Sequence, residues 1–215
     1  MRIFHRIDDV TICSREMSYV LDFFAESVRE FVVAAIPHDL TKAMASRICQ
    51  YTNCCVYQHG YQHVNRVSTG WCDEFPDSFL HTKHFIEMGK HRLEDLLQRM
   101  ITGYVPPWNN TGVKTIQILD ELGFRVYSAQ KNHTMPFRIN RDITVDVVAS
   151  YMPRITYKSF DHIIDEVKAL SNTDEEIGIL YHFKNVSADD LSKIVRFAKE
   201  VESMRDEKAA GGSLR

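Results

Sequence analysis

The segment FVVAAIPHDLTKAMASRICQYTNCCVYQH, residues 31–59, decides the fold class because it reads as a strand, a helix and a second strand. Residues 31–36 and 55–58 are short apolar runs typical of buried strands. Between them, Asp39 is positioned to cap a helix that extends to Tyr51. A strand–helix–strand unit favours parallel pairing through a right-handed crossover. The second strand runs directly into His59.

The same alternation continues through most of the 215 residues. Strands are predicted at residues 3–7, 31–36, 55–58, 103–105, 125–129, 144–149 and 177–182. Helices are predicted at residues 18–30, 39–51, 78–100, 111–122, 159–170 and 189–203. Seven strands that alternate with helices fit an open doubly wound sheet or a barrel of the (β/α) type. In both architectures, functional residues gather at the carboxyl ends of the strands.

The composition is that of a globular protein, with 44% hydrophobic and 26% charged residues. A net charge of −3 gives no basic field for nucleic acid, and no apolar run is long enough to span a bilayer. The N-terminal residues lack a secretory signal pattern, and the five cysteines fit no disulfide framework. We therefore expect a reduced, cytoplasmic protein with one domain over residues 1–205 and a flexible tail over residues 206–215. The oligomeric state is left open.

Four of the predicted strands end in residues suited to chemistry. These are Asp8 and Asp9 after the first strand, His59 and His63 after the third, Pro107, Trp108 and Asn109 after the fourth, and His182 on the seventh. Each group alone has a simpler explanation: an Asp pair can cap a helix, a His pair can arise by chance, and a histidine in an apolar strand can be a core residue. Because the strand ends converge on one face, all four together predict one site.

In this order the residues resemble the motifs of the polysaccharide deacetylase superfamily, the NodB-homology deacetylases of carbohydrate esterase family 4. That family has Asp-Asp after its first strand, His-(Ser/Thr)-x-x-His after the third, a Pro-aromatic segment after the fourth and Leu-x-His on the last. The corresponding segments here are residues 8–9, 59–63, 106–108 and 180–182. The resemblance covers nearly the whole chain and implies a distorted (β/α)7 barrel.

The chain departs from the family pattern in ways that mark an atypical member. Gly60 stands where the family has Ser or Thr. The family's Arg before the aromatic residue, which braces the catalytic Asp, is missing, because Tyr104 and Val105 occupy that place. We expect Asn109 or a basic residue elsewhere to take over the brace. Residues 126–133 show no match to the family's fourth motif.

The resemblance implies a metal-dependent hydrolase that removes an acetyl or other N-acyl group from an N-acetylated sugar or a related small substrate. Asp9, His59 and His63 would hold one divalent metal ion and leave positions open for water and substrate. This ligand set suits zinc best, with cobalt, nickel or iron as alternatives. Asp8 would act as the general base, and His182 as the acid that protonates the leaving amine.

Further residues are expected to contact the substrate, Tyr61 of the histidine segment among them. Trp108, with Pro107 and Asn109 beside it, would form a wall for a sugar ring or the acyl methyl group. A backbone N–H near Tyr61 or Trp108 would stabilise the oxyanion. His38, at the end of the second strand, is another candidate contact.

Other polar residues have a simpler interpretation. Glu74 is expected to be an exposed loop acid, and His81, His84 and His91 to lie on a solvated helix face. Two alternatives to deacetylation remain open: another amide hydrolysis, such as deformylation or opening of a cyclic amide, and a non-catalytic carbohydrate-binding relative. The missing Arg favours the latter, whereas the intact Asp and His pairs argue against it.

Overall fold

The computed structural model describes residues 2–130, 141–142, 147–148, 160–172, 176–183 and 188–211. The strand predicted at residues 144–149 lies partly outside these ranges, as does the end of the predicted tail. Of residues 126–133, which show no match to the fourth motif, only residues 126–130 are described.

The strands and helices alternate as the sequence predicts. The strands are β1 (Arg2–Val10), β2 (Phe31–Ala35), β3 (Cys54–His59), β4 (Gly103–Val105), β5 (Val126–Tyr127), β6 (Arg141–Asp142), β7 (Val147–Val148) and β8 (Glu176–His182). The helices are α1 (Arg15–Ser27), α2 (Lys42–Ile48), α3 (Thr82–Leu97), α4 (Val113–Glu121), α5 (Phe160–Ser171) and α6 (Ala188–Gly211), with a 3-10 turn η1 (Pro107–Asn109). The sequence did not predict β6, because two residues are too few to carry a periodic pattern.

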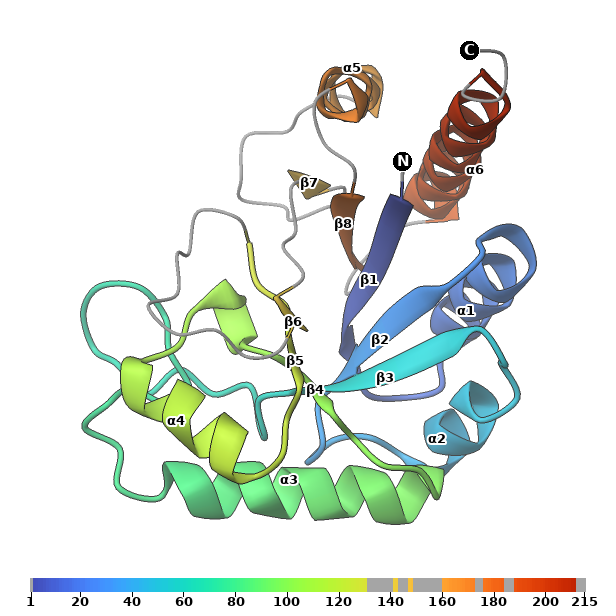
Figure 1. Cartoon of the computed structure of the whole chain (residues 1–215). Coiled ribbons are helices and arrows are strands. Elements are labelled where there is room, and N and C mark those ends of the chain that lie inside the picture. The colour runs from blue at the N-terminus through green and yellow to red at the C-terminus, as the bar shows by residue number, and fades with distance from the viewer. Residues whose placement is uncertain are drawn as a thin grey trace.

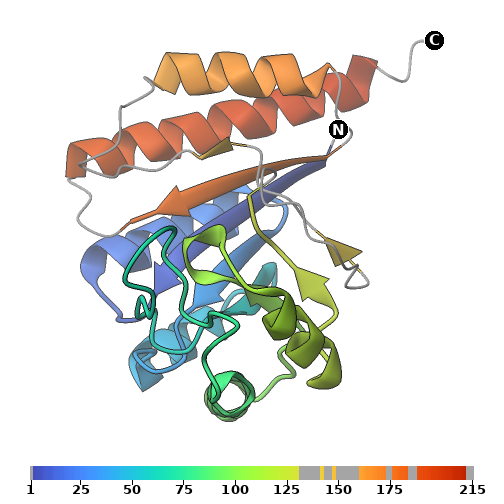
Figure 2. The same ribbon diagram turned by 90° about the vertical axis from the view of Figure 1, so that its left-hand side faces the viewer.

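All these strands belong to one parallel sheet in the order β6-β5-β4-β3-β2-β1-β8-β7. The sheet curls, and the helices surround its outer side, with α5 and α6 above, α1 and α2 to the right, and α3 and α4 below (Figure 1). Figure 2 shows α5 and α6 lying side by side above β8. The predicted distorted (β/α)7 barrel is confirmed.

The two faces of the sheet differ in what they bury. The outer face of β1 contributes Ile3, Ile7 and Val10 to the main core, which the surrounding helices complete. The inner face holds a smaller apolar cluster that includes Phe4 and Val32. The interior is otherwise available to polar side chains, and the site is built there.

Helix starts differ from the sequence expectations where a nearer capping residue exists. Ser14 caps α1 by accepting the Met17 N–H at 3.1 Å, so the helix begins before the predicted residue 18. Asp39 does not cap α2, because Thr41 accepts the Met44 N–H at 3.3 Å. Asp39 instead lines a cavity described below.

The last helix is longer than predicted, and a buried polar cluster holds it to the sheet. α6 reaches Gly211, so residues 206–211 of the predicted tail are helical. His5, fully buried in β1, lies 2.9 Å from the Tyr181 hydroxyl and 2.9 Å from a Glu202 oxygen of α6. These bonds join β1, β8 and α6 into one unit.

The five cysteines are all free. Of the adjacent pair that precedes the histidine motif, Cys54 is buried and Cys55 is exposed, as alternation along a strand requires. Within the described residues, no helix has the length and apolarity needed to cross a membrane.

Candidate metal centre

A bulge at the end of β1 turns two consecutive aspartates towards the barrel interior. Between Ile7 and Val10, β1 advances three residues while its partner β2 advances two, so β1 carries one extra residue. Asp9 has a φ of 60°, in the left-handed region that few non-glycine residues adopt. Neighbouring side chains of a regular strand point to opposite faces, whereas here Asp8 and Asp9 both contact residues of the site.

The two histidines flank a tight loop. His59 is the last residue of β3 and is 2% exposed, and its Nδ1 lies 3.0 Å from the Val105 carbonyl oxygen. An Nδ1–H that donates to this carbonyl leaves Nε2 free to bind a metal, the arrangement usual for metal-binding histidines. His63 has a φ of 57°.

Left-handed backbone is concentrated at this site. The described non-glycine residues with positive φ are Asp9, His63, Gln98, Trp108 and Asn109, and all but Gln98 lie here. Strain of this kind persists only where the surroundings hold it, and it gathers at functional sites.

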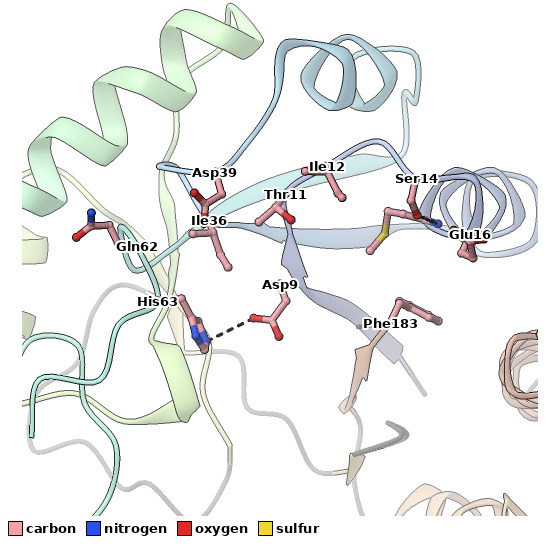
Figure 3. Close-up of a pocket in the computed structure, with 11 residues that line it drawn as sticks. Asp9, Thr11, Ile12, Ser14, Glu16, Ile36, Asp39, Gln62, His63 and Phe183 are labelled. Carbon is pink, nitrogen blue, oxygen red and sulfur yellow. Dashed lines mark hydrogen bonds and ion pairs between the residues drawn. The ribbon is translucent and has the colours of Figure 1, made fainter. Parts of the chain in front are cut away.

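Three atoms of the predicted ligands converge. Asp9 Oδ1 lies 3.4 Å from Nε2 of His59 and 3.4 Å from Nε2 of His63, the pair drawn in Figure 3. Ligand atoms about 2.0–2.1 Å from a tetrahedral zinc ion would stand roughly 3.3 Å apart. Asp9 Oδ1 is also buried, with no hydrogen-bond partner among the described residues. A buried carboxylate oxygen that lies between two imidazole nitrogens fits a divalent cation, and in the described part of the chain no other such group of potential ligands exists.

Burial and neighbouring charge separate the titration of the three side chains. Burial alone would raise the pKa of Asp9, but the adjacent His59 and His63 outweigh it and hold that pKa well below its ordinary value. Burial opposes protonation of His59, yet Asp9 and Asp8 raise its pKa. Burial and the neighbouring His59 lower the pKa of His63 to about 4. In the absence of a cation, the first proton therefore goes to His59.

Arg6 supplies the brace that is missing from the fourth strand. Its Nε and Nη2 donate to the two carboxylate oxygens of Asp8 at 2.9 and 3.0 Å. Nη1 reaches across the interior to the carbonyl and hydroxyl oxygens of Ser128, both at 2.8 Å. Nη2 also donates to Asn109 Oδ1 at 2.7 Å, so Asn109 acts on Asp8 through Arg6. Because Arg6 and Asp8 stand two apart on one strand, their side chains share a face. This spacing is the feature of the sequence that could have indicated Arg6 as the brace of Asp8.

The η1 segment places its aromatic residue against a candidate ligand. Pro107 is buried, and Trp108 has a φ of 55°, which turns it out of the regular path of the chain. The ring centroids of Trp108 and His63 are 4.3 Å apart. Trp108 therefore packs against the ring of His63.

Two expectations about the histidine loop need correction. The Tyr61 side chain is buried and packs on Phe85, with ring centroids 5.2 Å apart, so it does not face the cavity. The Tyr61 N–H donates to Glu74 Oε2 at 3.1 Å, so this N–H group is already engaged. Glu74 itself is fully buried rather than exposed. Burial raises the pKa of Glu74, while the N–H groups of Gln62 and Tyr61 oppose that rise.

His182 enters the site from the last strand. It pairs in register with Asp8, and it lies close enough to Asp9 to contribute to the lowering of the pKa of that carboxylate. Its Nδ1 is buried and has no hydrogen-bond partner among the described residues. A core histidine would normally have this nitrogen satisfied.

A cavity of about 460 Å³ opens beside Asp9 and His63. Its far side is formed by Ser14 and Glu16, where α1 begins, and by Phe183 after β8 (Figure 3). Ile36 and Asp39 also line it. His38, the predicted substrate contact, is not among the residues that line this cavity; it is half exposed, with its Nδ1 2.6 Å from Asp39 Oδ1. His81, directly before α3, and His84 and His91 within it are exposed as expected.

Comparison with known proteins identifies the fold. No protein-family model and no curated protein sequence matches the chain. Solved structures do match it: a peptidoglycan N-acetylglucosamine deacetylase has a TM-score of 0.64 at 13% identity, over 97% of this chain and 83% of that one. A family 4 carbohydrate esterase from Streptomyces lividans, in complex with acetate, has a TM-score of 0.61 at 15% identity, over 94% and 88%.

A third similar structure is described as a pseudoenzyme. It is a family 4 protein from Bacillus anthracis, with a TM-score of 0.62 at 10% identity, over 94% of this chain and 61% of that one. The chain thus has the fold of the family 4 carbohydrate esterases, and the resemblance in the motifs is confirmed at the level of the fold. Since one protein with this fold is described as a pseudoenzyme, the fold alone does not establish enzymatic activity.

Proposed function

We propose that the protein is a metal-dependent hydrolase that removes an acetyl, or another N-acyl, group from an N-acetylated sugar or a related small substrate. The observation that carries this proposal is the pairing of two carboxylates with different partners. Asp9 faces two imidazole nitrogens at 3.4 Å, whereas Asp8 is held by Arg6 at 2.9 and 3.0 Å. In this proposal Asp9 binds the metal, whereas the hydrogen bonds from Arg6 hold Asp8 beside the metal without making it a ligand.

The residues divide the reaction between them. When bound, the metal would supply an acidified water and polarise the acyl carbonyl group. Asp8, fixed in orientation by Arg6, takes the proton from the attacking water as general base. His182, whose Nδ1 is buried and unpaired among the described residues, delivers a proton to the departing amine. The cavity beside Asp9 and His63 holds the substrate.

The Arg6 brace also bears on the non-catalytic alternative. That reading drew its support from the absent arginine, and Arg6 restores the contact from another position. A site that only bound carbohydrate would have no use for a buried arginine that holds a second carboxylate beside the ligands. Zinc as the metal and a cytoplasmic location, which the five free cysteines favour, belong to the same proposal.

The test combines metal analysis with product analysis. The purified protein is assayed for bound divalent metal and for acetate released from N-acetylglucosamine oligomers, with Asp8→Asn as the matched control. Metal together with acetate release that the control lacks supports the proposal. Metal with release of a different acid from a panel of amides supports the alternative hydrolysis, and metal without turnover supports the non-catalytic reading.

A further inference from the structure

Glu74 is a buried acid that the proposed reaction does not use. It lies in the loop between His63 and α3, is 0% exposed, and does not line the cavity. A carboxylate buried this completely is costly unless its oxygens are hydrogen-bonded. The function of Glu74 therefore lies in the groups that it binds.

Those groups belong to the segment that joins the two candidate ligands. Glu74 Oε2 accepts the Tyr61 N–H at 3.1 Å, and Oε1 accepts the Gln62 N–H at 2.7 Å. Both oxygens are thus engaged with the backbone between His59 and His63. Each bond has an anionic acceptor, which makes it stronger than a bond between neutral groups.

Gly60 is the counterpart of this carboxylate. Its φ is +58°, and a Cβ added there would stand 1.9 Å from Glu74 Oε2 and 2.6 Å from Pro107 Cγ. The carboxylate fills the space in which a side chain at position 60 would lie. The position of the Glu74 carboxylate therefore requires glycine at position 60, where the motif has Ser or Thr.

The chain also holds Glu74 in place from its own side. The loop that leads to it closes on itself, since the Arg66 N–H donates to the Asp73 carbonyl at 2.9 Å and the Asp73 N–H donates to Asn65 Oδ1 at 3.1 Å. These two hydrogen bonds fix the backbone that carries Glu74.

We propose that Glu74 is a positioning residue for the metal centre, which folds the segment 59–63 so that the Nε2 atoms of His59 and His63 both face Asp9. This inference rests on the proposed metal site. The left-handed backbone of His63, with a φ of 57°, is the conformation that the Glu74 bonds maintain. Loss of these bonds would free the loop and move one imidazole away from the other two ligand atoms.

The test compares Glu74→Gln with Asp73→Asn. Gln is isosteric but replaces one acceptor oxygen with an NH₂ group that opposes a backbone N–H. Asp73→Asn alters the adjacent carboxylate, which accepts the Phe75 N–H at 2.8 Å and, among the described residues, has no hydrogen bond to segment 59–63. Zn²⁺ affinity is measured by competition with a chromophoric chelator, folding by melting of the metal-free protein, and coordination geometry by the visible spectrum of bound Co²⁺.

Glu74→Gln is expected to weaken Zn²⁺ binding about 10–100-fold, the range for partners that orient metal ligands. It should also alter the Co²⁺ spectrum, while Asp73→Asn keeps the wild-type affinity and spectrum. A lower melting temperature with unchanged affinity and spectrum would overturn the inference and make Glu74 purely structural. If Glu74→Gln does not fold, Glu74→Asp, which keeps the charge but shortens its reach, takes its place under the same criteria. Wild-type protein that binds no metal would instead refute the proposed function itself.

Discussion

Arg6 and Asp8 stand two residues apart on β1 and form a buried ion pair through two parallel hydrogen bonds, at 2.9 and 3.0 Å. The pair is tied to distant parts of the chain, because Ser128 and Asn109 accept the remaining guanidinium protons. The orientation of the proposed base is thus determined by three separate segments.

Replacement of Arg6 should separate charge from geometry. Arg6→Lys keeps a cation but cannot form the bidentate pair, so kcat/KM should fall roughly 10–100-fold with metal content unchanged. Arg6→Met leaves Asp8 buried without a partner and should cost about 3–5 kcal/mol in the free energy of unfolding. Adding Asp8→Asn to Arg6→Met should recover part of that loss, as denaturant titration would show. Strictly additive effects would mean that the two residues do not depend on each other.

The two aspartates should respond differently to the same substitution. Asp8→Asn should retain the metal and lose about 10²–10⁴-fold in turnover, the range for removal of a general base. Asp9→Asn should lose metal affinity first, because Asp9 Oδ1 is the atom that lies between the imidazoles. Elemental analysis and acetate release on both variants make the comparison. Equal metal loss in the two would show that Asp8 is a ligand and not the base.

Metal binding should displace about one proton at pH 6. His59, whose pKa Asp9 and Asp8 raise, is protonated there in the metal-free protein, whereas His63, with its pKa lowered to about 4, is already neutral. Affinity should therefore weaken as the pH falls, about tenfold per pH unit. A second proton enters only near pH 4. Calorimetric titration in two buffers of different ionisation enthalpy counts the protons, and release of two at pH 6 would contradict the assignment.

His182→Ala tests the proposed acid through the chemistry of the leaving group. An amine must be protonated as it departs, whereas the anion of an activated aryl ester is stable without a proton. The variant should lose far more activity on N-acetyl substrates than on an activated acetyl ester, with metal content and melting temperature nearly unchanged. Equal losses on both substrates, or merely a lower melting temperature, would assign His182 to the core.

The strand and helix pattern was predictable because it is local. β4 has the bounds that the sequence predicts. β2 ends one residue earlier than predicted, and β8 begins one residue earlier. Helix ends were less accurate where two capping residues compete, as Thr41 and Asp39 do. The chain order of the motifs was enough to predict which strand ends meet.

The supports of the site could not be predicted in the same way. The contact of Gly60 with Glu74 joins residues in different loops, and nothing in their spacing indicates it. The orientation of the Tyr61 ring could not be predicted either, because only the packed structure shows that it turns towards Phe85. Arg6 and Asp8 share one face of a strand by their spacing, but the spacing alone does not show that the two side chains pair.

The extra residue in β1 matters to anyone who would graft this site onto another parallel sheet. In a regular strand without the extra residue, the side chain of Asp9 would point to the same face as Ile7, into the main apolar core. There a carboxylate would cost several kcal/mol and would be out of reach of both imidazoles. A successful graft must therefore copy a mismatch in length between two neighbouring strands, a quantity that no residue-by-residue comparison of side chains records.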